Sequence, residues 1–211
     1  MFSFLRYVVV AAFCFSLLSL IVLVLKTFIW GRKTLHSEPR GKAFRGILYA
    51  FGRGMMPWEK ESAAKNLPTY VAGVLYHSGI FAGLVYVFLC VAALDLSPLS
   101  ISILRIIIVG GFASGTGLLL KRILKPTLRE ISFPDDFASN ILVDLFLAAA
   151  FIDSLYPSIK TVLYVVSIVL FLYMPVGKIR HCFFFFYSRV LFGMFFGRRG
   201  VFPQDQGTLN T

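Results

Sequence analysis

The sequence predicts an all-α membrane protein: a polytopic bundle of about five transmembrane helices, with its N-terminus outside and its C-terminus in the cytoplasm. Three observations lead to this prediction. Hydrophobic residues make up 58% of the 211 residues and charged residues only 15%. Apolar runs approach the roughly 20 residues that a membrane span needs. Lysine and arginine collect in alternate loops between these runs. A water-soluble domain of this length usually carries more charge.

The first predicted span covers about Tyr7–Trp30. Its start could pass for a signal peptide, but the apolar run is longer than the usual signal core and lacks a good small-residue cleavage site. We therefore expect a retained first helix. The segment 31–67 that follows is mixed polar, basic and aromatic. It holds too few apolar residues for a core of its own, so we predict a cytoplasmic basic loop that serves as a docking surface.

Four further spans are predicted along the rest of the chain, and prolines fall at their boundaries, where helices begin and end. The fourth is short and contains Asp144, and the fifth is open-ended. The Phe-rich segment beyond it is expected to extend that helix or to lie along the inner interface. Residues 1–200 would then form one transmembrane domain, followed by a cytoplasmic tail, 201–211. The predicted spans are about Thr69–Leu94, Pro98–Leu120, Phe137–Ile152 and Pro157 to at least Tyr173.

The distribution of basic residues predicts the orientation. Nearly all lysines and arginines lie in the loop after the first span, the loop after the third, or the tail. Only Arg6 and Lys160 fall on the other side, and Arg105 lies inside a span. Because basic loops remain in the cytoplasm, these loops are predicted to face inward across a cell inner membrane.

The net charge of +11 would favour a nucleic-acid partner in a soluble protein. Here the charge lies in the loops, so we expect membrane orientation and no nucleic-acid binding. The three cysteines, Cys14, Cys90 and Cys182, form no CxxC pair. An iron–sulfur cluster or zinc site within this chain is therefore not expected, and the three are interpreted as buried small apolar residues.

Three histidines are present: His36, His77 and His181. His36 lies in the basic loop. His77 lies in the second predicted span and His181 near the cytoplasmic end of the fifth, so both fall toward the same face. Ionisable residues inside a membrane are functional candidates, and two imidazoles from facing helices can ligate one haem iron. The alternatives are an interhelical hydrogen bond for His77 and an interfacial place near headgroups for His181.

Basic residues at the level of the two histidines could pair with haem propionates; they are Lys121, Arg122, Arg180 and Arg53, without a ranking. Gly73 precedes His77 by one turn and would clear space on the same face. The glycine pairs Gly79/Gly83 and Gly111/Gly115 are interpreted first as helix-packing sites. Arg105 and Asp144 are predicted to form an intramembrane ion pair, with a structural role favoured over a role at a quinone or proton path.

The sequence resembles the gamma subunit of respiratory nitrate reductases and related membrane cytochromes b of heterodisulfide-reductase-like and sulfite-reduction-associated complexes. The resemblance covers roughly residues 70–185. Its motifs are Leu75-Tyr76-His77-Ser78-Gly79-Ile80, the Gly-rich 110–115 leading to Leu120-Lys121-Arg122, and Met174-Pro175-Val176-Gly177-Lys178-Ile179-Arg180-His181.

The resemblance implies two haems b stacked across the membrane, with His77 and His181 as the inner ligands. The outer haem would need histidines near Val87 and near Leu163 and Tyr164, and none is present there. We therefore expect one haem b on the cytoplasmic side. The resemblance also implies quinone or quinol as a diffusible substrate and cytoplasmic iron–sulfur subunits as partners.

These observations predict a membrane-anchor cytochrome b subunit of a respiratory oxidoreductase complex that is not catalytic alone. The alternative is a non-haem polytopic membrane protein, either a small transporter or an assembly or scaffold subunit, in which His77, Asp144 and Arg105 would form a polar path. A lipid-modifying membrane enzyme is disfavoured because the three histidines are scattered.

Overall fold

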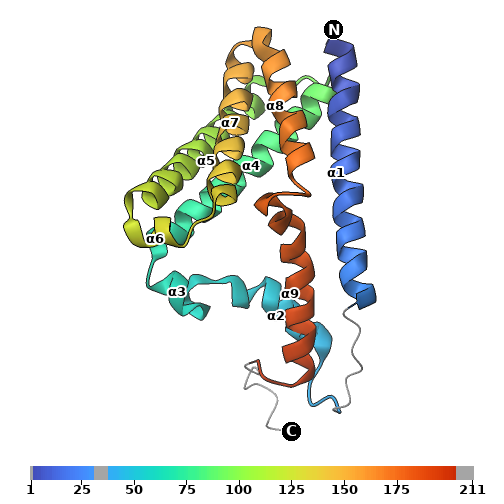
Figure 1. The fold of residues 1–211 in the computed structure, drawn as a ribbon, viewed down its shortest axis with the longest axis vertical. Coiled ribbons are helices and arrows are strands. Elements are labelled where there is room, and N and C mark those ends of the chain that lie inside the picture. The colour runs from blue at the N-terminus through green and yellow to red at the C-terminus, as the bar shows by residue number, and fades with distance from the viewer. Residues whose placement is uncertain (1, 31–37, 203–211) are drawn as a thin grey trace. The chain divides into compact units, whose positions relative to one another are not determined.

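The computed structural model describes residues 2–30 and 38–202, which are almost entirely helical (Figure 1). Short 3-10 turns lie at Arg53–Met55, Pro57–Glu59, Pro157–Ile159 and Lys178–Arg180. The helices are α1 (Phe2–Trp30), α2 (Ala43–Phe51), α3 (Glu61–Ala64), α4 (Leu67–Ala92), α5 (Pro98–Leu124), α6 (Pro126–Glu130), α7 (Pro134–Leu155), α8 (Lys160–Tyr173) and α9 (His181–Arg198).

Among the described residues, five helices are long and apolar enough to cross a membrane, the number that the sequence predicts: Phe4–Ile29, Leu67–Ala92, Pro98–Leu124, Pro134–Leu155 and Lys178–Arg198. The first four correspond to the first four predicted spans. The fifth differs. The predicted helix from Pro157 onward ends at Tyr173 and is a shorter apolar helix, while α9 reaches spanning length. The length and hydropathy of these helices make the chain a multi-pass helical membrane protein.

The chain divides into two compact units. The first consists of residues 1–21 and 68–180, and the second of residues 22–67 and 181–211. Helix α1 contributes its first part to one unit and its last part to the other. Each unit is described separately below. His36 and most of the predicted tail lie outside the described residues.

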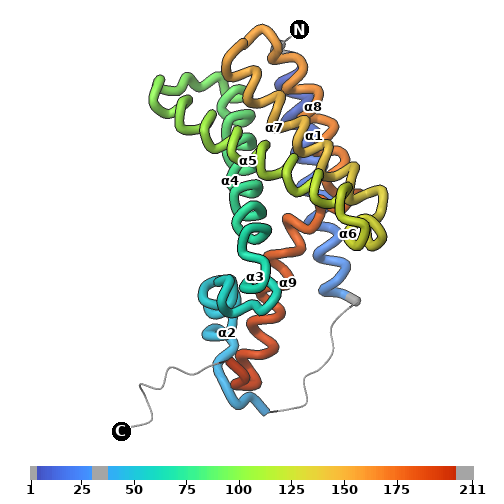
Figure 2. Tube along the Cα trace, turned by 90° about the vertical axis from the view of Figure 1, so that its left-hand side faces the viewer, coloured from blue at the N-terminus to red at the C-terminus, as the bar shows by residue number. Residues whose placement is uncertain are grey.

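The first unit is built around α7, which packs against both α5 and α8 (Figures 1 and 2). Its core contains the fully buried side chains of Ile108, Phe146, Leu147, Leu163 and Phe171. Helices α4 and α5 approach closely, because a Cβ added to Gly79 would lie 2.5 Å from the Cα of Gly111. The predicted packing role of this glycine pair is thereby confirmed.

Helix α5 begins at the predicted residue, and α7 begins at Pro134, three residues before its predicted start. Pro98 is the first residue of α5, where its missing N–H costs no hydrogen bond. Ser97 caps this helix by accepting a hydrogen bond from the Ser100 amide at 3.2 Å. At the start of α7, the Asp136 carboxylate accepts from the Phe133 amide at 2.9 Å. The two caps hold the ends of α5 and α7.

The second unit centres on the crossing of α2 and α9. The two backbones touch at glycines: a Cβ at Gly46 would meet the carbonyl oxygen of Gly193, and one at Gly193 would lie 2.5 Å from the Cα of Ile47. The amides of Arg40 and Gly41 both donate to the carbonyl of Arg198, at 2.9 and 3.0 Å. The predicted basic loop is therefore helical over part of its length, and it pairs with the C-terminal helix.

Candidate functional site

His77 lies on the exposed face of α4, among apolar side chains that include Val74 and Phe81. Its Nδ1 is 2.7 Å from the carbonyl oxygen of Gly73, one turn earlier. A carbonyl can only accept, so Nδ1 carries the proton and the neutral ring has its lone pair on Nε2. This is the tautomer that a metal-ligating histidine adopts when a backbone carbonyl orients it.

Gly73 gives this face of α4 its open surface. A Cβ added to Gly73 would meet nothing within 4 Å. The neighbouring residue Tyr76 points into the interior of the first unit. The phenol of Tyr76 and the imidazole of His77 therefore lie on different faces of α4. The space that the sequence predicted beside His77 is present.

His181 is the first residue of α9, and it is exposed. His181 is the first residue of the C-terminal segment of the second unit, whereas His77 belongs to the first unit. Arg180 is the last residue of the preceding 3-10 turn and is exposed as well. The two histidines predicted as haem ligands therefore belong to different units, and each is described within its own unit.

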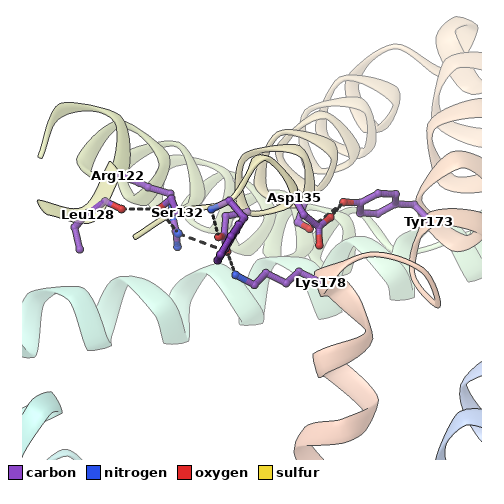
Figure 3. Close-up of polar contacts among 9 residues, drawn as sticks. Arg122, Leu128, Ser132, Asp135, Tyr173 and Lys178 are labelled. Carbon is purple, nitrogen blue, oxygen red and sulfur yellow. Dashed lines mark hydrogen bonds and ion pairs between the residues drawn. The ribbon is translucent and has the colours of Figure 1, made fainter. Parts of the chain in front are cut away.

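Arg122 belongs to a polar network at the start of α7 (Figure 3). Its Nη1 donates to the Ser132 hydroxyl at 3.0 Å and lies 3.5 Å from the Asp136 carboxylate. Lys178 pairs with the same carboxylate, and Ser132 donates to the carbonyl of Leu128 at 2.6 Å. Arg122 is therefore tied to an internal carboxylate, which the sequence did not predict.

The phenol of Tyr173 donates to the carboxylate of Asp135 beside this network (Figure 3). A Cβ at Gly177 would meet the far end of the Tyr173 ring, so the two residues fit closely at this turn. This turn separates α8 from the segment that leads to His181. It explains why the predicted fifth span ends at Tyr173.

The predicted ion pair between Arg105 and Asp144 is wrong. Arg105 instead donates from Nε to the Ser154 hydroxyl at 3.0 Å, and from Nη2 to the Ser154 carbonyl. Ser154 lies ten residues beyond Asp144, or about 15 Å along α7. Arg105 therefore contacts the end of α7 and not the middle of that helix, where Asp144 lies.

Asp144 is 7% exposed and belongs to a cluster between α4, α5 and α7. The Asn140 amide nitrogen lies 3.1 Å from Asp144 Oδ2, 3.1 Å from the Tyr76 hydroxyl and 3.4 Å from the Gly115 carbonyl. The Tyr76 hydroxyl also contacts the Asn140 carbonyl at 3.3 Å. Asp144 Oδ1 has no hydrogen-bond partner among the described residues.

A second buried carboxyl lies near the other end of α7. Asp153 is fully buried, and its Oδ2 accepts from the Tyr86 hydroxyl at 2.7 Å. Lys160 acts on it electrostatically. Neither this pair nor the cluster around Asp144 was predicted. The spacing of Asp136, Asn140 and Asp144 at i, i+4 and i+8 was the available signal, because it places three polar side chains on one face of a helix.

Arg53, one of the propionate candidates, lies in the second unit and pairs with Glu59 at 2.6 Å. The hydrogen bonds from Arg53 and Tyr49 lower the pKa of the Glu59 carboxyl, and the bond to Glu59 raises the pKa of the Tyr49 phenol. Burial, with the charge of Arg189, lowers the pKa of Lys60. Lys121, another candidate, donates to the Thr69 hydroxyl.

The cysteines differ from their predicted burial. Cys14 and Cys182 are exposed, and only Cys90 is partly buried. Their thiols therefore line outer helix faces, which suits a helix surrounded by lipid as well as burial does. Comparison with protein-family models, with curated proteins and with solved structures found no match.

Proposed function

We propose that this chain is the membrane-anchor cytochrome b subunit of a quinone-linked respiratory oxidoreductase complex. It holds one haem b through His77 and His181 and carries electrons between the quinone pool and a cytoplasmic iron–sulfur partner. The observation that carries the proposal is His77. An ionisable side chain on the apolar face of a spanning helix is a functional candidate. The ring is already oriented by Gly73 in the metal-ligating tautomer.

The residues present fit a haem in three respects. The Gly73 carbonyl orients the His77 ring, and Gly73 leaves open space on the same face for a flat macrocycle. Arg122 makes both of its contacts through Nη1, and the remaining guanidinium donors can meet an anionic propionate. Arg180 adjoins His181 in the sequence and is exposed. A haem b, when bound, would supply a one-electron redox centre.

The packing supports one haem rather than two. Val87, Leu163 and Tyr164, where the resemblance would require the outer ligands, are fully buried in the core of the first unit. The Tyr164 hydroxyl donates to the Cys90 carbonyl at 3.2 Å. Close-packed side chains occupy these positions and provide no nitrogen ligand, so the electron path of the proposal uses a single inner haem.

The second unit offers the surface for the cytoplasmic partner. Arg40, Lys42, Arg45 and Lys65 are exposed there, and so are the aromatic rings of Phe44 and Trp58, at 68% and 70%. Basic side chains steer an acidic partner toward the surface, and large exposed rings can anchor it. The same charges fit the proposed inward orientation of this segment.

The test is a reduced-minus-oxidised absorption spectrum of the purified chain, with a pyridine haemochrome assay for haem per protein. We expect about one haem b per chain, lost in His77→Ala and in His181→Ala. His36→Ala is the matched control and should keep the haem.

About two haems per chain would contradict the single-haem assignment. A well-folded preparation without haem would overturn the cytochrome proposal in favour of a transporter or scaffold. Retention of haem in His77→Ala would remove the ligand on which the proposal depends.

A further inference from the structure

We propose that Asp144 is a proton-binding site in the middle of the membrane and that it exchanges its proton with the Pro134 end of α7. The inference rests on the buried cluster of Asp144, Asn140, Tyr76 and Gly115, not on the haem. Asp144 is more than nine-tenths buried, and its Oδ1 has no hydrogen-bond partner among the described residues. That oxygen lies where a Cβ would stand if Gly115 were alanine, so glycine makes the room for it.

A carboxylate in these surroundings requires a proton. Each ion pair of the described chain leaves Asp144 out. The groups facing it are the neutral phenol of Tyr76 from α4, the backbone of Gly115 from α5, and Asn140 from its own helix. On α8, Tyr164 and Tyr173 are bonded elsewhere, and Lys160 acts on Asp153. An unpaired charge in hydrocarbon is costly, so Asp144 holds a proton on Oδ1.

The cluster favours a proton over a metal cation. Asn140 turns its NH₂ group toward Asp144, Tyr76 and Gly115, so its hydrogens fill the space between the oxygens. A sodium ion needs several oxygen lone pairs directed at one point, and an amide N–H in their midst repels it. A proton on Oδ1 needs only one acceptor and leaves Oδ2 free to keep its bond from Asn140.

The polar face of α7 gives the proton a route. Asp136, Asn140 and Asp144 follow at intervals of one turn, and Asp136 lies in the network with Arg122 and Lys178. The distance from Asp136 to Asp144 is about 12 Å along the helix axis. Phe146, Leu147 and Ala150 follow on the other side and are buried in the core. Polar side chains therefore follow Asp144 turn by turn toward the Pro134 end of α7, whereas buried apolar side chains come next toward the other end.

The experiment is infrared spectroscopy of the purified full chain in lipid, transferred from H₂O to D₂O. We expect a protonated-carboxyl band that is absent in Asp144→Asn and still present in Asp153→Asn. It should shift to lower frequency in D₂O before the amides of the spanning helices exchange, and it should disappear as the pH is raised. Haem content should stay unchanged in Asp144→Asn, which separates this inference from the proposed function.

A spectrum of Asp144→Asn that loses no band would mean that the carboxyl is ionised, and would overturn the proposal. A band that stays unshifted for as long as the amides remain protected would make Asp144 a structural acid, with the same consequence. If Asp144→Asn fails to fold, the native chain is treated with dicyclohexylcarbodiimide instead. An adduct that mass spectrometry locates at Asp144 supports the site. An adduct only at Asp153, no adduct, or protection by Na⁺ but not K⁺ would overturn it.

Discussion

Arg105 shows how a single side chain can complete a membrane helix. The last four carbonyls of a helix have no partner within it, and in hydrocarbon each unsatisfied group is costly. Ser154 lies one residue before the end of α7, and Arg105 from α5 donates to both its carbonyl and its hydroxyl. The guanidinium also places positive charge at the negative end of the helix dipole. The arginine thus joins α5 to α7.

We expect Arg105→Leu to destabilise the chain by about 1–3 kcal/mol, because the Ser154 carbonyl loses a charged donor. Arg105→Lys should lose less, since one donor and the charge remain. The measurement is the thermal unfolding midpoint of the purified protein, followed by circular dichroism. Arg129→Gln, at an exposed arginine of α6, is the control. Equal midpoints for Arg105→Leu and the control would contradict the capping role.

At the scale of the element, α5 carries two adjacent glycines with opposite surroundings. A Cβ at Gly111 would lie 2.5 Å from the Cα of Gly79 on α4, whereas one at Gly110 would meet nothing within 4 Å. A comparison of the two positions therefore distinguishes the intrinsic cost of glycine in a helix from the stability that close helix packing at Gly111 provides. Alanine normally stabilises a helix interior by roughly 0.5–1 kcal/mol relative to glycine.

Gly110→Ala should therefore leave the unfolding midpoint unchanged or raise it, and Gly111→Ala should lower it, because α4 and α5 must move apart. Both variants are compared by thermal unfolding in the same detergent. If the two substitutions shift the midpoint in the same direction by the same amount, the α4–α5 contact is not what Gly111 provides.

The elements also show what the sequence could predict. Hydropathy and the prolines Pro98 and Pro134 located α4, α5 and α7 within a few residues, because both signals are local. The break after α8 was missed because apolar residues continue past it, although Pro175 lies there and cannot donate a helical hydrogen bond. The pairing of α2 with α9 was missed too, since its contacts join distant parts of the chain.

The same contrast holds for the candidate site. His77 and its space beside Gly73 could be found from residue types and helical spacing. The partners of Arg122, Arg105 and Asp144 could not, because each lies on another helix or depends on depth in the membrane. Spacing on one helix fixes which side chains share a face, whereas tertiary contacts decide which of them meet.

At the scale of the whole molecule, the charge distribution predicts which side of the membrane each turn faces. Asp95 lies in the turn before α5 and Glu130 at the end of α6, beyond the other end of α5; both are exposed. They form a matched pair of acidic residues whose replacement leaves every lysine and arginine in place.

In a chain with its three cysteines replaced, Asp95→Cys should react with a membrane-impermeant maleimide in right-side-out vesicles, and Glu130→Cys should react only after the vesicles are opened. The readout is the mass shift of the labelled chain. The reverse pattern would invert the proposed orientation. It would also place the basic surface of the second unit on the outer side.

The crossing of α2 and α9 has a consequence for biosynthesis. Helix α2 leaves the ribosome early, but the glycines it packs against, Gly193 and Gly197, emerge only near the end of translation. Until then the partner face of α2, with the backbone at Gly46, has nothing to cover it. The helices of the first unit are inserted during this interval. The nascent chain must therefore keep α2 from competing partners during this interval, and a ribosome that stops before α9 would release a product in which α2 lacks its partner helix.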